Sequence, residues 1–293
     1  MDVEAIIQKA RPSLKPQSTK TYVSNIRKIA GTKEIDNLKF LDDPNAVFSL
    51  MSTYKLSMKR NILSSILVLL SSVATETDTK EALRKTYADK LLELTDEMKV
   101  ELAKNNKTET QEKNWVSLAE LRKITKALIR NSPDSQNTMI AALYSLQEPK
   151  RLDFYDMEIV TPKQERSDNK NYLIITNRSK KTFIFNDYKT SRKYGTVAMP
   201  VNKELNTVIN KFLKYNPDRK YLLQGKDGRP VSRNNLGKMI TKIFASTGKQ
   251  VSLNIIRHVY VSENVDIQKI KEQNELAASM MHGGATQLEY AKT

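Results

Sequence analysis

The sequence contains no cysteine, and only two histidines and one tryptophan among its 293 residues. The absence of cysteine excludes a disulfide scaffold, a zinc site built on thiolates and a cysteine nucleophile. The most apolar run, 62–74, is interrupted by four serines and is shorter than the roughly 20 residues that cross a bilayer. The first residues lack the apolar stretch and the cleavage site of a signal peptide. We therefore expect an intracellular protein.

Positive charge is in excess: 49 Lys and Arg stand against 33 Asp and Glu, a net charge of +16. Hydrophobic residues make up 39% of the chain, which is enough to bury real cores over a length that suits two domains. An excess of this size favours a polyanion as partner. Because the charge is spread along a folding chain, a nucleic acid fits better than an acidic membrane surface.

The excess is uneven along the chain. Residues 1–110 hold 18 basic and 15 acidic side chains, whereas 111–293 hold 31 and 18. A polar segment without apolar periodicity, KNNKTETQEK, separates two helical patterns, as a linker does. We predict a helical domain over 1–105, a linker over 106–113 and a more basic domain over 114–293.

Helical periodicity covers the first domain. Tyr22, Ile26 and Ile29 share one face of a predicted helix over 19–30. Ser57 is placed to cap a second helix that runs to Ala74, and a long amphipathic helix follows over 78–104.

In the second predicted domain the hydrophobic pattern changes from a helical period to a strand period after the first two helices. Ser117 and Glu120 form a capping-box pattern for a helix that runs to 129, and 135–146 predicts another. Short segments rich in branched and aromatic residues then predict an antiparallel sheet, over 157–160, 172–177, 182–186 and 196–200. Helices resume at Lys203, with Ser232 as the cap of a later one. The predicted fold is mainly α with a small antiparallel β-sheet.

Both histidines, His258 and His282, lie in the last forty residues. Arg257 precedes His258 in an otherwise apolar helical stretch, where a guanidinium is costly unless it has a partner or lines an anion site. Tyr290 follows His282 by eight residues.

A basic turn lies between the last two predicted strands. The segment NDYKTSRKYG carries Lys189, Arg192 and Lys193 at the tip of a predicted hairpin. Cations placed there can meet the phosphates of a nucleic acid. A solvated charge run is the equally favoured alternative.

The order of these motifs resembles the tyrosine recombinases, or phage-type integrases. The resemblance rests on EPKRLDFYDMEI, YKTSRKYG, LNIIRHVYVS, MMHGG and a terminal tyrosine, and on STKTYVSNIRKI and SMKRNILSSIL, which are similar to the family's core-binding domain. In detail these motifs are most similar to a subgroup in large DNA viruses of eukaryotes and their mobile elements. The resemblance implies a helical core-binding (SAM-like) domain followed by an α+β catalytic domain.

The resemblance also implies an activity. Such enzymes cleave and rejoin DNA through a 3′-phosphotyrosyl intermediate, without a metal or cofactor. Tyr290 would be the nucleophile, Arg257 and His282 would stabilise the charged transition state, and Lys189 would be the general acid. Double-stranded DNA would be the partner, with self-association from dimer to tetramer on it. The protein would work in the cytoplasm or nucleoid, or in the viral factory or nucleus of an infected host.

Two positions depart from the family pattern. Asn254 stands where most members carry a histidine, and an amide cannot accept and carry a proton as imidazole does. Lys150 stands in the place of the first arginine, with Arg151 beside it and rotated by about 100° on a helix. An ammonium there replaces a bidentate fork, so both residues stay candidates for the site.

Other functions stay open at this point. A type IB topoisomerase uses a similar residue set to relax DNA, and a recombinase fold that has lost catalysis would bind DNA only. Asp153, Asp156 and Glu158 raise the lesser alternative of a metal nuclease. Further candidates for contact with the DNA backbone are Lys59, Arg60 and Arg233.

Overall fold

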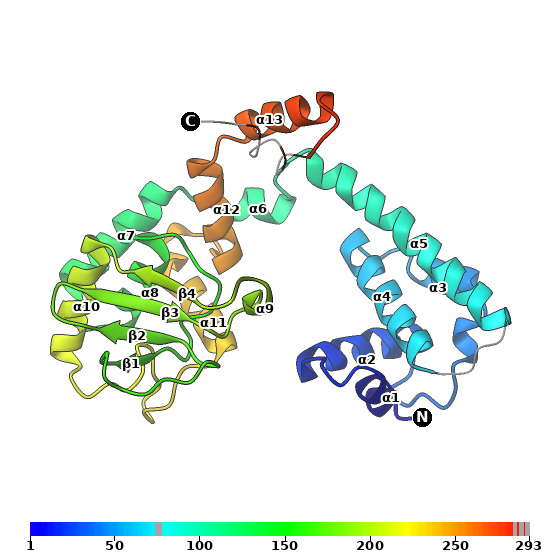
Figure 1. Cartoon of the computed structure of the whole chain (residues 1–293), viewed down its shortest axis with the longest axis horizontal. Coiled ribbons are helices and arrows are strands. Elements are labelled where there is room, and N and C mark those ends of the chain that lie inside the picture. The colour runs from blue at the N-terminus through cyan, green and yellow to red at the C-terminus, as the bar shows by residue number, and fades with distance from the viewer. Residues whose placement is uncertain (74–77, 284–285, 287–289, 291–293) are drawn as a thin grey trace. The chain divides into compact units, whose positions relative to one another are not determined.

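The structure is a computed structural model that describes residues 1–73, 78–283, 286 and 290. The chain divides into two compact units, Met1–Asn106 and Lys107–Thr293, which are described separately (Figure 1). Within the described residues, no helix is long and apolar enough to span a membrane.

The first unit is helical. Its elements are α1 (Val3–Ala10), α2 (Pro16–Ala30), the short 3-10 helix η1 (Lys39–Leu41), α3 (Pro44–Leu50), α4 (Leu56–Ser72) and α5 (Asp78–Ala103). Helix α4 contacts α1, α2 and α5, because Ile62, Leu63, Ile66 and Leu69 are fully buried on it. This serine-broken apolar run is therefore the centre of the first core.

Ser57 does not cap α4, contrary to the sequence prediction. The helix begins at Leu56, so Ser57 lies inside its first turn, and the cap residue Lys55 makes no side-chain cap hydrogen bond. A serine inside the first turn has its own backbone in helical geometry and cannot act as the N-cap. The predicted end of this helix, Ala74, lies outside the described residues.

Two buried polar contacts fix the helices of the first unit. Asn25 Nδ2 on α2 donates to Ser65 Oγ on α4 over 2.9 Å. The Tyr87 hydroxyl on α5 donates to the carbonyl of Leu41 over 2.9 Å, and its ring meets Phe48 edge-on. Buried polar groups of this kind specify one packing arrangement, because no other places their partners correctly.

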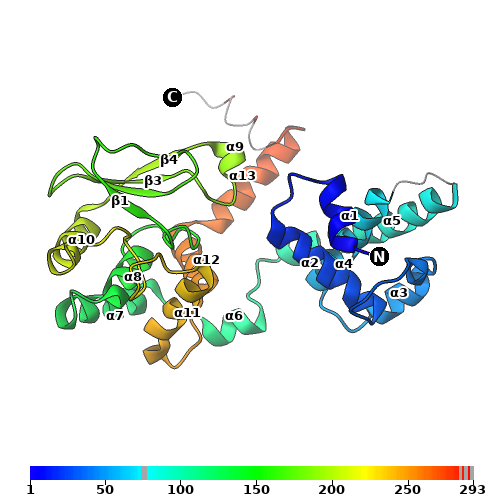
Figure 2. The ribbon, with the colours of Figure 1, turned by 90° about the horizontal axis from the view of Figure 1, so that it is seen from below.

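Within the described residues the second unit contains the 3-10 helix η2 (Ala245–Thr247) and eight α-helices. The α-helices are α6 (Glu109–Asn114), α7 (Leu118–Asn131), α8 (Gln136–Ser145), α9 (Ser191–Tyr194), α10 (Lys203–Tyr215), α11 (Arg233–Ile243), α12 (Leu253–Asn264) and α13 (Ile267–Ser279). Helix α8 is buried along its C-terminal eight residues and packs against α7, α10, α11 and α12. Figure 2 shows it with the sheet on one side and α7 on the other.

The predicted linker 106–113 is helical over much of its length. Thr108 Oγ1 accepts a hydrogen bond from the backbone N–H of Gln111, and Gln111 Oε1 accepts one from the backbone N–H of Thr108; α6 begins at the next residue. This reciprocal capping box starts a helix even in a polar segment. Composition alone indicated a linker because it carries no information on this local pairing.

The sheet has the order β1-β2-β3-β4, formed by Glu158–Val160, Tyr172–Ile175, Lys181–Phe185 and Val197–Pro200. β2–β3 and β3–β4 are antiparallel, but β1 and β2 are parallel. The prediction of an antiparallel sheet was wrong for that pair, because the loop 161–171 returns the chain to the starting end of β1, as a parallel pair requires. The fold class, mainly α with one small sheet, is confirmed.

Buried Asn171 ties together the segments on either side of the sheet. Its Nδ2 donates to the carbonyls of Asp153 at 3.0 Å and Asp187 at 2.9 Å. Its Oδ1 accepts from the backbone N–H groups of Asn186 and Asp187. All four hydrogen bonds of one fully buried amide therefore hold the segment after α8 against the end of β3.

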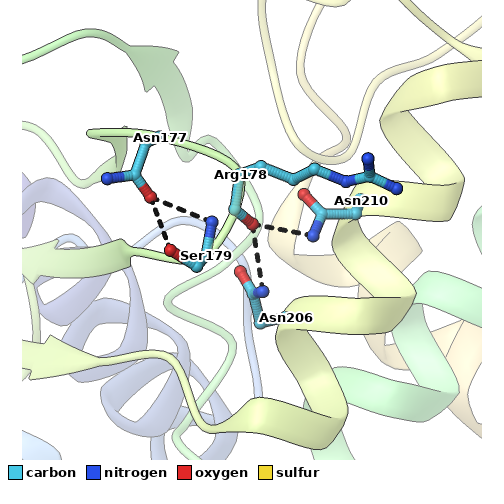
Figure 3. Close-up of a pocket in the computed structure, with 5 residues that line it drawn as sticks. All are labelled: Asn177, Arg178, Ser179, Asn206 and Asn210. Atoms are coloured by element: carbon cyan, nitrogen blue, oxygen red, sulfur yellow. Dashed lines mark hydrogen bonds between the residues drawn. The ribbon is translucent and has the colours of Figure 1, made fainter.

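A second polar connection joins the β2–β3 turn to α10. Figure 3 shows the carbonyl oxygen of Arg178 accepting from the amides of Asn206 and Asn210. Buried Lys181 Nζ donates to the same carbonyl and to both Asn Oδ1 atoms, at 2.6–3.0 Å. All three hydrogen-bond acceptors are neutral, so burial lowers the pKa of Lys181 below its ordinary 10.5.

We predict that Asn171→Ala lowers the free energy of unfolding by about 3 kcal/mol, because it leaves two backbone N–H groups and two carbonyls without partners. Urea unfolding would measure this. The matched control is Asn169→Ala, an exposed position on the same loop, where a change within about 0.5 kcal/mol is expected. Equal losses in the two variants would contradict the role of Asn171.

Lys181 predicts a dependence of stability on pH. Its pKa is lower in the folded than in the unfolded chain, so unfolding takes up a proton between the two pKa values and stability rises with pH there. The free energy of unfolding should therefore increase relative to that of Lys181→Met as the pH rises toward 10.5, where the gain ends. Denaturant titrations of both proteins across pH 7–11 test this, and a difference that stays constant would refute it.

Candidate functional site

Arginines from three parts of the second unit surround one buried carboxylate. Asp153 follows α8, and its side chain is only 8% exposed. Arg151 precedes it in the same loop, Arg233 is the first residue of α11, and Arg257 lies on α12. The packing of α8 against α11 and α12 is what brings these segments together.

The pKa of the Asp153 carboxyl reflects the charged groups around it. Burial raises the pKa of the Asp153 carboxyl most, and the negative charge of Asp187 raises it further, whereas the charges of Arg233, Arg151 and Arg257 lower it. Its Oδ1 atom is buried without a hydrogen bond. Three guanidinium groups thus act on Asp153, and Arg233 also interacts with Asp187 and with the carboxyl group of Asp156. We call Arg151, Arg233 and Arg257 the arginine cluster, because guanidinium groups are the side chains best suited to hold an anion.

Arg233 makes only long ion-pair contacts with the carboxylates of Asp153 and Asp187. Its Nη2 lies 3.8 Å from a carboxylate oxygen of both Asp153 and Asp187, which is longer than a hydrogen bond. Its guanidinium carbon stacks 4.7 Å from the centre of the Tyr155 ring. The side chain also hydrogen-bonds with Tyr155, and it is 45% exposed, so part of it is accessible to a ligand.

The structure separates Lys150 from Arg151. Arg151 acts on the Asp153 carboxyl, and its own carbonyl accepts a hydrogen bond from the buried Tyr144 hydroxyl at 3.1 Å. Lys150 is half-buried and has no hydrogen bond or ion pair among the described residues. Arg151 is therefore the member of this pair whose charge reaches the cluster.

The segment that carries Lys189 begins beside the cluster. Asp187, which faces Arg233, lies two residues before Lys189, and Lys189 itself is exposed. The Tyr188 hydroxyl donates to the carbonyl of Gly195 over 2.8 Å and closes the base of the segment. Gly195 has a φ of +66°, which favours glycine.

The connection between β3 and β4 differs from a simple hairpin turn. It contains the short helix α9, on which Arg192 and Lys193 are both exposed. Lys193 Nζ lies 5.1 Å from the ring centre of Tyr194, which is also exposed. This arrangement presents cations and an aromatic ring to solvent a few residues after Lys189.

Helix α12 places Asn254 one turn before Arg257. Asn254 is exposed, and Arg257 is half-buried next to Asp153. His258, the next residue, is exposed as well, and the helix turns it away from Arg257 by about 100°. Asn254 thus lies near the helix face that Arg257 occupies.

His282 and Tyr290 pair with each other. Their rings stack with centres 5.4 Å apart and planes at 24°. His282 Nδ1 lies 3.3 Å from the carbonyl of Gly283, and its Nε2 is buried without a hydrogen bond. Tyr290 is 67% exposed. Among the residues that the structure describes, no hydrogen bond, ion pair or ring contact joins this pair to the arginine cluster.

The two candidates in the first unit behave differently from the cluster. Arg60 Nε donates to Thr95 Oγ1 over 3.1 Å, and its Nη1 lies 2.7 Å from Met98 Sδ, so the side chain links α4 to α5. Lys59 is half-buried beside it. Packing between helices accounts for the position of Arg60.

Some residues of the site escaped the sequence analysis. Asp187 lies in the segment NDYKTSRKYG and Tyr155 in EPKRLDFYDMEI, where other residues carry the motif. Their proximity to Arg233 depends on the tertiary fold and could not be predicted. Asn171 has no sequence signal, because an asparagine between two strands is typical of a turn. Glu158 pairs with Lys170 over 2.7 Å, and no three His, Asp or Glu side chains of the described chain are grouped as metal ligands.

Comparisons with known proteins add a distant structural neighbour. No family model matches the sequence, and no curated protein matches it. A solved structure described as the crystal structure of XerA recombinase is similar over 92% of this chain and 87% of its own, with 9% identity and a TM-score of 0.37. At these values the functional conclusion depends on the residues of this chain.

Proposed function

We propose that this protein cleaves and rejoins DNA as a tyrosine recombinase does, with the scissile phosphodiester bound at the arginine cluster. One observation carries the proposal: Arg151, Arg233 and Arg257 come from separate segments and converge on the buried Asp153 carboxylate. Guanidinium groups match phosphate oxygens with two parallel hydrogen bonds, and a fixed set of them stabilises the charge that a phosphoryl transition state gathers.

In this proposal the carboxylates position the arginines. Asp153 and Asp187 hold Arg233 between them at 3.8 Å, which is too far for either carboxylate to accept a hydrogen bond from it. A phosphate oxygen would supply the missing acceptors. The Asp153 carboxyl, whose pKa burial already raises, would keep the guanidinium planes oriented without itself contacting the DNA.

Tyr290 would be the nucleophile. Its phenolic oxygen would form a bond to phosphorus as the bond between phosphorus and the 5′-oxygen breaks, and the energy of the broken ester is kept for rejoining. A phenol has a pKa near 10 and needs positioning to react at neutral pH. Stacking on His282 restricts the ring, and the exposed hydroxyl can release its proton to water.

Lys189 would protonate the departing 5′-oxygen. It is exposed, and its segment starts at Asp187 beside the cluster, so a phosphate bound to Arg233 lies near the base of this segment. His282 would add a donor to the phosphate through its unpartnered Nε2. The DNA itself would bring the His282–Tyr290 pair to the cluster.

A binding-only function is the second candidate. It is favoured by Asn254, and by the lack of contact between Tyr290 and the cluster in the described chain. Such a protein would hold DNA at the arginines without forming a covalent link. Membership of the viral and mobile-element subgroup, self-association on DNA and the cellular location stay predictions from the sequence motifs.

A nicked duplex distinguishes these two functions. If Tyr290 attacks phosphorus, a substrate with a nick beside the cleavage point should trap a covalent protein–DNA adduct, because the small fragment diffuses away. The adduct would appear as a slower band on a denaturing gel. Tyr290→Phe should abolish it, and Tyr260→Phe, on α12, should leave it intact. Failure of the wild-type protein to form any adduct while it still binds the duplex would establish the binding-only function.

Substitutions at adjacent positions test which residue holds the phosphate. Removing one fixed donor to a transition-state oxyanion costs on the order of 100-fold in rate. We expect that loss in adduct formation for Arg151→Ala, and less than a tenfold loss for Lys150→Ala. Thermal unfolding of both variants controls for damage to the fold. The opposite order, with both variants folded, would place Lys150 in the site.

A further inference from the structure

Helix α7 presents a basic face that lies outside the candidate site. Arg122, Lys123, Lys126 and Arg130 line a shallow hollow of about 580 Å³, and the small side chains of Ala119 and Ala127 complete its lining. All four cations are exposed. No member of the arginine cluster lines this hollow, and no carboxylate does.

The charges of this basic face are uncompensated. Among the described residues none of the four cations makes an ion pair. Arg122 Nε donates to the carbonyl of Ser145 and Arg130 Nε to the amide oxygen of Asn131, which are both neutral.

Three lysines on or directly after the long helix α5 have acidic partners, unlike the cations of α7. Lys90 and Lys99 on α5, and Lys104 directly after its last residue, each pair with an acidic residue three positions earlier or later. Like charges four residues apart destabilise a helix by a few tenths of a kcal/mol per pair, so the arrangement on α7 has a small cost to folding that an anionic partner would offset.

The rest of α7 fixes the direction of the basic face. Leu118, Leu121 and Thr125 are buried, and α7 packs through that side against α8 and α12. Eight residues separate Arg122 from Arg130, which corresponds to a rise of about 12 Å. Phosphates along one DNA strand advance about 3.4 Å per nucleotide, so the face spans about three to four of them.

We infer that the basic face of α7 binds the phosphodiester backbone of duplex DNA at a place separate from the scissile phosphate. The inference rests on the DNA-binding part of the proposed function and adds a second contact to it. Backbone binding needs only a row of unpaired cations at a matching spacing, which the face provides. An acidic protein surface is the other possible occupant, and the experiment distinguishes it.

The test compares two pairs of lysines with the same spacing in the full-length chain. Lys123→Gln with Lys126→Gln removes two charges from the basic face. Lys211→Gln with Lys214→Gln removes two exposed charges from α10, at the same three-residue separation. The dissociation constant for a duplex would be measured for each double variant and the wild type between 50 and 200 mM salt.

Each lost phosphate contact reduces the slope of log affinity against log salt by about 0.9. We expect the α7 variant to lose about 1.8 from the slope, so that its affinity falls about tenfold less than that of the wild type across this range. The α10 variant should keep the wild-type slope. Equal slopes in all three proteins, or equal losses in both variants, would overturn the inference, and the first result would leave an acidic protein as the occupant.

Adduct formation at saturating DNA separates this inference from the proposed function. The α7 variant should form the Tyr290 adduct at the wild-type rate once the duplex is fully bound. If the slope changes as expected but the wild-type protein forms no adduct, the α7 contact is supported and the recombinase function is refuted. If the wild-type protein forms the adduct but the α7 variant keeps the wild-type slope, the recombinase function is supported and the α7 contact is refuted.

Discussion

Burial of the Asp153 carboxylate is the constraint on which the second unit depends. A charge removed from water must be compensated by partners, and here three guanidinium groups supply them from different segments. None of the three is saturated by this interaction, because Asp153 Oδ1 has no hydrogen bond and Arg233 stays beyond hydrogen-bond distance. The free chain therefore holds three arginines around a buried carboxylate whose Oδ1 makes no hydrogen bond, and our proposal places a phosphate at these arginines.

The packing of helices around α8 explains how a small number of residues positions this site. Helix α8 is buried and positions the loop that follows it, while α11 and α12 pack on the same helix and carry Arg233 and Arg257. Asn171 then attaches that loop to the end of β3, where Asp187 begins the segment of Lys189. Rigid helices, one amide and one carboxylate thus determine the positions of cations that are far apart in sequence.

Much of the fold could be predicted from local patterns. Ser135 and Ser232 begin α8 and α11 because a serine oxygen accepts from the first free backbone N–H groups, a signal that the sequence carries directly. The parallel pairing of β1 with β2 could not be predicted, since it depends on the path of a loop. The capping box of α6 was present in the sequence, but its polar composition is also typical of a linker.

The candidate site was partly visible for similar reasons. Arg257 was identified because a guanidinium in an apolar stretch needs a partner, and Arg151 because it lies beside Lys150, which stands in the position of the family's first arginine. The position of Arg233 beside Asp153 and Asp187 depends on how α11 packs, so only its charge could be read from the sequence. Asn171 offered no signal, because its four partners are all backbone groups, which every sequence contains.

A structure of the full chain bound to a duplex with its cleavage site tests the central claim most directly. The arginine cluster should hold one phosphate, with guanidinium nitrogens of Arg151, Arg233 and Arg257 about 3 Å from its non-bridging oxygens. Asp153 should remain beneath them without contact to the DNA. A duplex whose phosphates all lie beyond hydrogen-bond distance of these three side chains would contradict the claim.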